Sequence, residues 1–307
     1  MKSHRYFSKN FGRQKAAFGT VFAVSELHRK SNMNIKTLKS KELWLDSFSI
    51  AIALLAAIET ICAVCDFGIK DFVEVTIWWK KLFIILGTFV GIGVLIAIFK
   101  CIQYSKSVSF TIHNIPVNIK EGDIFNFSDW KIIPFNEFFD TQVDDVIIAH
   151  NTLNGVFIDN HVTDLNDLNT TISGAPRIRN LTARPVNGKI RHQLGRIIPY
   201  NNYLLLALSH FDNNQATLTH TQYESCLRTM WHEISRTYAN RPVALPLLGG
   251  GITRFENPAI KTELQLLRCI LCTLKTANAS INQPITIILT KDSIKKINLY
   301  ELKKQFS

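Results

Sequence analysis

The sequence lacks several features that would define its class at once. Its six cysteines form no disulfide framework, because three lie in or beside apolar stretches and two on a predicted amphipathic helix (Cys62, Cys65 and Cys101; Cys269 and Cys272). A structural zinc site needs four ligands, and no partner group is spaced to complete one. Neither the P-loop pattern nor the Rossmann glycine pattern is present, and no internal repeat or low-complexity tract occurs. We therefore interpret the cysteines as small buried hydrophobic residues in a reducing compartment.

Acidic residues are scarce near the N-terminus. Residues 1–42 hold ten Lys and Arg against Glu26 and Glu42, so +8 of the chain's formal charge of +11 lies in this segment. A basic protein raises the question of nucleic-acid binding. Here the charge directly precedes an apolar span, and near anionic lipid each Lys or Arg contributes roughly 1 kcal/mol. We interpret residues 1–42 as a basic segment next to a membrane and expect no nucleic-acid partner.

Two long apolar stretches follow. Residues 47–65 are interrupted only by Glu59, and residues 82–99 contain no charge at all. Eighteen helical residues span about 27 Å, close to the thickness of the hydrocarbon core. Aromatic and cationic residues typical of a bilayer interface flank the second stretch (Trp78, Trp79, Lys80, Lys81 and Lys100). The pattern predicts a transmembrane hairpin over residues 43–102, with spans at about 45–65 and 82–102. The alternative for each span is a buried helix of a soluble domain.

The distribution of Lys and Arg predicts the orientation of this hairpin. In the linker 66–81, three lysines are balanced by three acidic residues, whereas the preceding segment is strongly basic. The positive-inside rule therefore places the N-terminus in the cytoplasm. Two crossings return the chain to the same side, so everything after about residue 103 is expected to be cytoplasmic as well.

Three residues of the hairpin suggest that its helices associate. Gly87 and Gly91 form a GxxxG pattern, which lets helix backbones approach closely. Glu59 is an ionisable group within the predicted hydrocarbon region, where such groups normally face a partner or a water-filled interior. A protonated Glu59 with a hydrogen bond inside the hairpin is the alternative, and the sequence leaves both open.

The remainder of the chain alternates strand-like and helix-like segments, which indicates an α/β domain over residues 107–307. Predicted strands lie at 107–113, 131–135, 203–211, 242–248 and 284–290, and the last three are nearly continuous apolar runs. One helix is expected to begin at a capping box, Thr221 with Glu224. Another is expected after Asn257 and Pro258. A basic helix over residues 294–304 closes the chain.

Three consecutive glycines, Gly249 to Gly251, follow the predicted strand 242–248, with Arg254 close behind them. Ligands of open α/β sheets bind at the carboxyl ends of strands, and glycines there let backbone N–H groups approach a phosphate. An ordinary flexible turn is the alternative. The position at a strand end favours a phosphate-binding loop.

A second candidate site combines a turn and a strand end. Asp123, in the turn from Gly122 to Phe125, is able to accept a hydrogen bond from an exocyclic amine such as that of adenine. Asn136 at the end of the strand 131–135 is in a position to reach a ribose hydroxyl. Taken alone, each residue is more often a turn former.

In order, these motifs resemble the macro domain, an α/β/α sandwich that binds ADP-ribose. In that family a Gly-Asp-Ile turn reads adenine, a strand ends in an Asn near the distal ribose, and a later strand leads into a glycine-rich phosphate loop. The resemblance covers about residues 108–307 and implies a set of ligand-binding residues: Asp123, Ile124, Phe135, Asn136, Asp140, Asn154, Leu248, Gly249, Gly250, Gly251, Ile252, Thr253 and Arg254.

The sequence departs from hydrolytic members of that family. They usually carry a denser Asn pair and a glycine-rich loop after the Asn-terminated strand. The corresponding stretch here, 137–155, contains several Asp and Asn residues and a single glycine. We therefore expect binding without hydrolysis, no catalytic residue, no metal and no cofactor.

The whole arrangement, a basic tail, a hairpin and a macro-like domain, resembles the Thoeris anti-phage effector that carries a macro domain. The resemblance implies a bacterial inner-membrane protein with both termini in the cytoplasm. It implies that a TIR-domain partner makes an ADP-ribose-derived signal, such as histidine–ADP-ribose. Binding of the signal would then cause homo-oligomerisation and membrane disruption. The alternatives are a membrane-anchored ADP-ribosyl hydrolase and a scaffold for ADP-ribosylated proteins.

One basic stretch has no assigned role. No acidic residue occurs between Leu168 and Phe211, while six basic residues lie there (Arg177, Arg179, Arg184, Lys189, Arg191 and Arg196). This stretch is expected to form a solvated hairpin or to approach the diphosphate, the membrane or a neighbouring subunit.

Overall fold

The computed structural model describes residues 34–65, 78–175, 184–186, 188–212, 214–238, 240–251, 253–256 and 261–307. The chain divides into two compact units, Met1–Lys106 and Ser107–Ser307. Several sequence predictions lie outside the described residues: most of the basic tail, the linker between the spans, Arg177, Arg179, Ile252, and the proposed helix start at Asn257 and Pro258.

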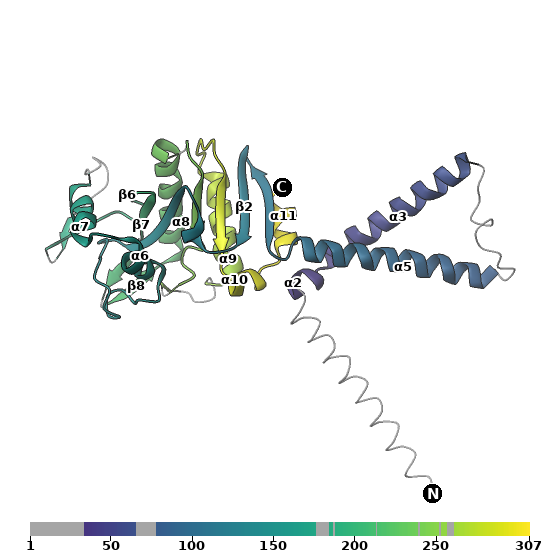
Figure 1. The fold of residues 1–307 in the computed structure, drawn as a ribbon, viewed down its shortest axis with the longest axis horizontal. Coiled ribbons are helices and arrows are strands. Elements are labelled where there is room, and N and C mark those ends of the chain that lie inside the picture. The colour runs from purple at the N-terminus through teal and green to yellow at the C-terminus, as the bar shows by residue number, and fades with distance from the viewer. Residues whose placement is uncertain are drawn as a thin grey trace, which may run out of the picture. The chain divides into compact units, whose positions relative to one another are not determined.

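The first unit contains a short helix α2 (Ile35–Leu38) and two long helices, α3 (Lys41–Val64) and α5 (Trp78–Gln103) (Figure 1). Ser40 caps α3, because its hydroxyl accepts from the backbone N–H of Leu43 at 3.4 Å. Both long helices are long and apolar enough to cross a membrane. At 24 residues, α3 reaches about 36 Å.

The two long helices pack through one small-residue face near one end of the hairpin. Leu43, Ser47 and Ala51 are buried on α3 at intervals of four residues. Gly93 and Ala97 are buried on α5 at the same interval. A Cβ at Gly93 would lie 2.4 Å from the Phe48 ring, so this close approach requires glycine. The hairpin contact is therefore made at Gly93, and a Cβ at Gly87 or at Gly91 would meet no atom within 4 Å.

The second unit is built on one sheet. Within the described residues, nine strands form it, with the order β1-β2-β11-β9-β3-β7-β8-β10 and β6 paired with β7. The central strands β2, β11, β9, β3 and β7 run parallel, and β1 pairs antiparallel with β2 at the edge. The strands are β1 (Ser107–Ile112), β2 (Ile115–Glu121), β3 (Trp130–Asn136), β6 (Ile197–Tyr200), β7 (Tyr203–Asp212), β8 (Gln215–Leu218), β9 (Val243–Pro246), β10 (Arg254–Phe255) and β11 (Ile285–Leu289), and a separate pair is formed by β4 (Arg184–Val186) and β5 (Lys189–Arg191).

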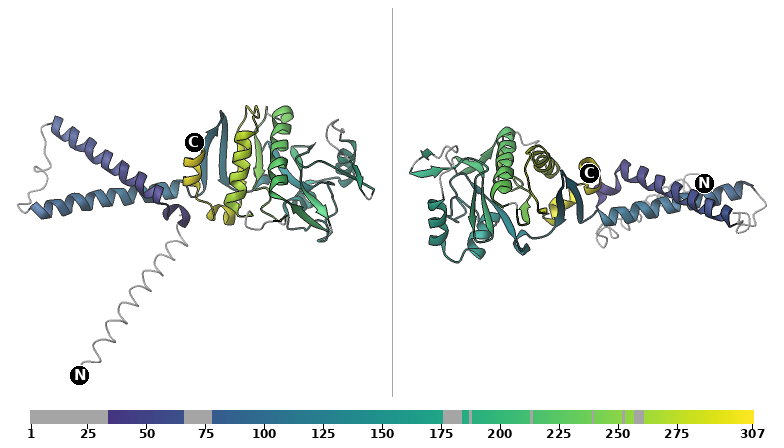
Figure 2. Two further views of the ribbon diagram at one scale, coloured as in Figure 1. Left: turned by 180° about the vertical axis from the view of Figure 1, so that it is seen from behind. Right: turned by 90° about the horizontal axis from the view of Figure 1, so that it is seen from above.

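Helices cover both faces of this sheet (Figures 1 and 2). Helices α6 and α7 pack on β3, β6 and β7, with Phe157, Ile158 and Leu168 buried against Ile133 and Leu205. On the other face lie α8 and α9, joined by a hydrogen bond of 3.1 Å from Trp231 Nε1 to Thr273 Oγ1. The helices are η1 (Ile124–Asn126), α6 (Leu153–His161), α7 (Leu165–Gly174), α8 (His220–Glu233) with its continuation η2 (Ile234–Tyr238), α9 (Glu263–Thr276), α10 (Lys291–Lys295) and α11 (Leu299–Phe306).

The α/β/α prediction is confirmed, and all five predicted strands are present. Several local predictions were incomplete or wrong. The helix expected to begin at Asn257 and Pro258 is α9, which begins at Glu263 because Thr262 caps it. Strand β2 was missed. Helix α8 begins two residues earlier than expected, because its capping box is formed by Thr219 and Gln222. Glu224 instead pairs with His220 at 3.3 Å. The expected helix over residues 294–304 is two helices, since Asn298 caps a new one.

Candidate functional site

A cleft of about 500 Å³ lies at the carboxyl ends of β3, β7, β9 and β11. Parallel strands bring their carboxyl ends to one edge of the sheet, where ligands of such sheets bind. The loops after β3, β9 and β11 complete the wall. Its lining comprises Pro134, Phe135, Asn136, Ile147, Ile148, Asn151, Thr152, Leu153, Asn154, Leu208, Ser209, Phe211, Ala216, Pro246, Leu247, Gly249, Gly250, Gly251, Thr253, Ile288, Thr290 and Ser293.

The glycine loop forms one wall of the cleft. Gly249 has a φ of +79°, a conformation that favours glycine, and a Cβ there would lie 3.0 Å from the Phe255 ring. A Cβ at Gly250 would lie 3.1 Å from the carbonyl oxygen of Leu247, whereas one at Gly251 would meet nothing within 4 Å. Lys261 fixes the far end of the loop, because its Nζ donates to the carbonyl oxygen of Gly251 at 2.7 Å.

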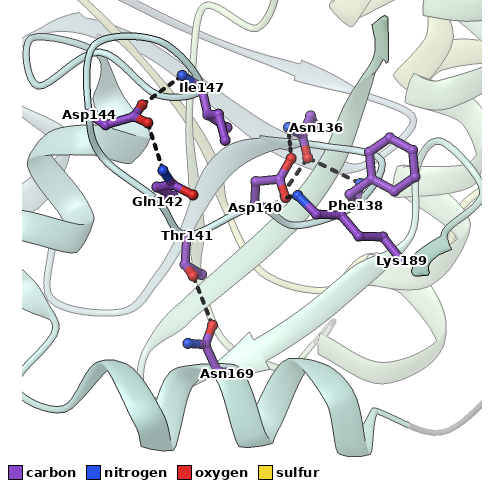
Figure 3. A network of polar contacts seen from close by, with 9 residues as sticks. All are labelled: Asn136, Phe138, Asp140, Thr141, Gln142, Asp144, Ile147, Asn169 and Lys189. Atoms are coloured by element: carbon purple, nitrogen blue, oxygen red, sulfur yellow. Dashed lines mark hydrogen bonds and ion pairs between the residues drawn. The ribbon is translucent and has the colours of Figure 1, made fainter. Parts of the chain in front are cut away.

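The loop after β3 is held by its own side chains (Figure 3). The Oδ1 of Asn136 accepts from the N–H groups of Phe138 and Asp140 at 3.1 and 3.2 Å, and its Nδ2 donates to Asp140 at 2.9 Å. Further along, Asp144 accepts from Ile147 N at 2.7 Å, and this hydrogen bond lowers the pKa of Asp144. The polar group of Asn136 is therefore committed to the turn that shapes the cleft.

The N-terminus of α6 also faces the cleft. Thr152 caps the helix, since its hydroxyl accepts from Gly155 N at 3.2 Å and donates to the carbonyl oxygen of Ala149 at 2.6 Å. A Cβ at Gly155 would lie 2.3 Å from that same carbonyl oxygen, so the loop can approach the helix only because residue 155 is glycine. First-turn N–H groups of a helix lack intrahelical acceptors and favour anions. The cleft is thus lined both by the start of α6 and by the glycine loop, within which the N–H of Gly250 donates to the carbonyl oxygen of Leu247 at 3.1 Å.

The structure brings seven of the predicted ligand residues into the cleft: Phe135, Asn136, Asn154, Gly249, Gly250, Gly251 and Thr253. The other described ones do not line it. Asp123 accepts from Phe125 N at 3.0 Å and caps η1, while Ile124 packs against Ala244 and Ile288. Leu248 is buried, and Arg254 donates to Gln215 at 2.9 Å. The ligand contacts assigned to these residues and to Asp140 stay predictions.

Sequence reasoning missed several residues of the cleft wall. Thr290 and Ser293 follow β11, where Thr290 caps α10 by accepting from Ser293 N at 3.2 Å. A Thr at a strand end followed three residues later by Ser was the available signal. Ser209 and Phe211 belong to the second half of β7. No local pattern marks them, because only the pairing of β7 with β3 brings them to the cleft.

Two cations of the basic stretch form ion pairs with acidic residues of the loop after β3, which borders the cleft. Arg191 on β5 donates to Glu137 at 2.9 Å, and Lys189 pairs with Asp140 at 2.5 Å. Burial raises the pKa of Glu137, but the hydrogen bonds from His210 and Arg191 outweigh it, so the pKa lies below its ordinary value. Glu137 is fully buried and directly follows Asn136. Arg191 and Lys189 therefore neutralise Glu137 and Asp140 in the loop after β3.

The cleft itself is uncharged. Among the described residues that line it, none is Asp, Glu, Lys, Arg or His. Its polar groups are amides, hydroxyls and backbone N–H groups, and the rest of its surface is apolar. Such a cleft suits a ligand with an apolar or aromatic part and an anionic part that accepts backbone hydrogen bonds.

This fold is that of a macro domain. A family model described as the macro domain of Thoeris protein ThsA matches residues 117–290. Thoeris protein ThsA of Bacillus amyloliquefaciens (strain Y2) is 37% identical over 234 residues, which cover 72% of this chain and 78% of that protein. The chain therefore belongs to the macro-domain family of the Thoeris anti-phage protein ThsA.

Solved structures give a slighter likeness. The macrodomain of Oceanobacillus iheyensis with ADP has a TM-score of 0.41 and 13% identity, and covers 65% of this chain and 95% of its own. Alphavirus P23pro-zbd has a TM-score of 0.37 and 14% identity, and covers 62% of this chain and 24% of its own. The family assignment rests on the family model and the Bacillus relative.

Proposed function

We propose that the macro domain binds an ADP-ribose-type signal nucleotide and that the chain is a membrane effector activated by it. The observation that carries this proposal is the cleft at the strand ends, which the Gly249–Gly251 loop and the start of α6 both line, so that backbone N–H groups of these segments would be available to a bound anion. A diphosphate accepts such hydrogen bonds. The apolar side chains Phe135, Ile147 and Phe211 would contact the base and the ribose rings.

A sensor is favoured over a hydrolase. Hydrolysis needs a base or an oriented water at the anomeric carbon, and the described lining of the cleft contains no ionisable side chain. We therefore propose that the chain holds its ligand intact and needs no cofactor. The hydrolase remains the second candidate, because Asn151 and Asn154 line the cleft and amides are able to orient a water. A scaffold for ADP-ribosylated proteins is the third.

The family supports the origin of the signal. Membership in a Thoeris family agrees with a signal that is made by a TIR-domain enzyme. We propose that this signal is an ADP-ribose derivative such as histidine–ADP-ribose. The contact with that enzyme is functional, through the diffusing nucleotide, and need not be physical. We propose a bacterial inner-membrane location with both termini in the cytoplasm, where such a nucleotide is made.

The hairpin supports the effector half of the proposal. Beyond the contact at Gly93, large apolar side chains of both helices are exposed, among them Ile58, Ile61, Phe83 and Leu86. A soluble protein rarely exposes so continuous an apolar surface. Lipid and other copies of the hairpin are the partners that would cover it. Because nothing in the part of the chain that the structure describes lies within 4 Å of a Cβ at Gly87 or Gly91, this face would accept a helix of another copy.

Titration of the 107–307 domain with ADP-ribose and its conjugates tests the nucleotide half. We expect saturable binding with no turnover after long incubation. Gly250→Val should abolish binding, because its Cβ would crowd the Leu247 carbonyl oxygen and its β-branched side chain would block the approach of the diphosphate. Gly174→Val at the end of α7 is the control, since a Cβ there meets nothing within 4 Å. Multiple turnovers would favour the hydrolase, and unchanged affinity in folded Gly250→Val would remove the phosphate-loop assignment.

A further inference from the structure

The positive charge of the macro domain is concentrated at its C-terminal end. Residues 291–307 contain five lysines and two acidic residues, a net charge of +3. The whole unit Ser107–Ser307 contains twenty Lys and Arg against seventeen Asp and Glu, which is also +3. Residues 107–290 therefore have a net charge of zero, and the whole net positive charge of the domain lies in its last 17 residues. We call residues 291–307 the basic edge; they form α10 and α11.

Four of the five lysines of the basic edge are exposed, and one of these, Lys296, pairs with Glu263 at 2.5 Å. Helix α11 buries Leu299, Leu302 and Phe306, and stacks the Phe306 ring on Phe110 of β1 with centroids 6.3 Å apart. Its opposite face carries Lys304, which is exposed. Lys291 and Lys295 are exposed on α10. Core packing thus fixes both helices to the sheet and leaves a cationic surface.

The strand register relates this edge to the start of the domain. Ser107, where β1 begins, is paired with Lys120 on β2, and Glu121 is paired with Leu289 at the end of β11. Neighbouring strands lie about 4.8 Å apart, so the start of β1 and the end of β11 are separated by roughly 10 Å. Helix α10 begins two residues after Leu289. The basic edge and the start of β1 therefore lie at the same edge of the sheet.

The start of β1 follows the end of α5 closely in the sequence. Ser107 follows Gln103 by four positions, and four fully extended residues span at most about 14 Å. Where α5 ends at a bilayer surface, that surface lies within reach of the basic edge. Lysines close to anionic lipid each gain roughly 1 kcal/mol, and the gain falls off within a Debye length.

We propose that the basic edge binds the anionic head groups of the bilayer in which the chain is anchored. This inference rests on the proposed membrane insertion of α3 and α5. Attachment by α10 has a consequence for the nucleotide site, because Thr290 and Ser293 of the same helix start line the cleft. Head-group binding would thus fix the orientation of the cleft relative to the membrane. The cleft wall formed by Thr290 and Ser293 would then belong to a helix that is bound to lipid.

Lysine acylation followed by mass spectrometry tests this on the full chain in lipid nanodiscs. In discs containing phosphatidylglycerol, Lys291, Lys295 and Lys304 should react about five-fold more slowly than in phosphatidylcholine discs, the factor that corresponds to about 1 kcal/mol per lysine. Lys275, at the end of α9 away from the cleft, should react equally in both and serves as the internal control. High salt should remove the protection, because it shortens the Debye length.

Paired variants separate charge from fold. Lys291→Gln with Lys295→Gln should lose the phosphatidylglycerol-dependent protection of Lys304, whereas Arg228→Gln with Lys275→Gln removes the same charge elsewhere and should keep it. Equal acylation rates in the two lipids would overturn the proposal. Protection of these lysines that is the same in both lipids but increases with the number of chains per disc would also overturn it, in favour of a contact between copies. A chain that does not enter discs at all would instead refute the membrane insertion on which the proposal rests.

Discussion

At the scale of single residues, the three glycines of the loop after β9 are not equivalent. Gly249 has a positive φ and faces Phe255, so Gly249→Ala should lower the free energy of unfolding by about 1–3 kcal/mol. Gly251→Ala is the matched control, with a change expected within about 0.5 kcal/mol, because a Cβ there meets nothing. Urea unfolding measures both. Equal losses would mean that the left-handed conformation at residue 249 is not what the loop requires.

Asp123 has two separable roles, a structural one seen here and a ligand contact that is predicted. Its carboxylate accepts from Phe125 N, and an amide oxygen would do the same. Asp123→Asn should therefore keep the stability of the domain yet weaken nucleotide binding by roughly 1–3 kcal/mol through the lost charged hydrogen bond. Isothermal titration against thermal unfolding distinguishes the two. An Asn variant that binds as tightly as the wild type would take Asp123 out of the ligand site.

At the scale of elements, β5 stabilises the turn under the cleft through Arg191 and the buried Glu137. Arg191→Gln should cost about 1–3 kcal/mol of stability at neutral pH, since it leaves a buried carboxylate with one partner fewer. Arg228→Gln is the control, because Arg228 is exposed and, among the contacts described, bonds only the Thr276 hydroxyl. A loss in Arg191→Gln no larger than in this control would show that β5 is dispensable to the turn.

The same pair gives the domain an acid limit. The native pKa of Glu137 lies below the ordinary value of about 4.3, so its stabilising contribution is complete above that pH and is lost as the pH falls through the native pKa. The unfolding free energy should therefore fall with decreasing pH below about 4.3, and less steeply in Glu137→Gln. Denaturant unfolding at a series of pH values measures the slopes. Identical slopes would mean that other carboxylates account for the acid dependence.

The elements that the sequence predicted are those whose pattern is local. The apolar runs of β7, β9 and β11 and the glycines after β9 are visible in the chain itself. Strand β2 was missed because Pro116 weakens its pattern, and its place beside β11 is a long-range pairing. The ion pair between Asp140 and Lys189 likewise joins residues that lie 49 positions apart in the sequence. Contacts of this kind follow from topology and cannot be read from neighbouring residues.

At the scale of the whole molecule, sensing and membrane damage are proposed to reside in different units. The cleft proposed to bind the nucleotide lies within Ser107–Ser307, and the exposed apolar helices lie within Met1–Lys106. Deletion of residues 1–102 should therefore leave ligand affinity unchanged and remove ligand-triggered depolarisation of cells. A soluble 107–307 domain as toxic as the full chain in the presence of ligand would show that the membrane is not the target. Depletion of a nucleotide pool would then explain the harm.

Clustering of hairpins is the step that would connect the two units. A ligand shifts an equilibrium only by its differential affinity for two states, so one assembly must bind the nucleotide better than the other. Confinement to a membrane raises the effective concentration, and a modest new contact between macro domains would then bring many hairpins together. The open faces at Gly87 and Gly91 and the exposed Glu59 are the groups available for that contact.

Substitutions in the hairpin test this step. Gly91→Leu would fill the open face, and Glu59→Ala would remove a carboxylate that is costly to leave in lipid unless a cluster surrounds it. Both should keep nucleotide binding and lose ligand-triggered depolarisation, measured with a potential-sensitive dye. Gly93→Leu differs, because its side chain would collide with Phe48 and disrupt the hairpin of a single chain. That variant should therefore lose its hairpin fold whether or not ligand is present. Full ligand-triggered depolarisation in Gly91→Leu, together with its loss in Gly93→Leu, would show that the hairpin acts alone and that clustering is not required.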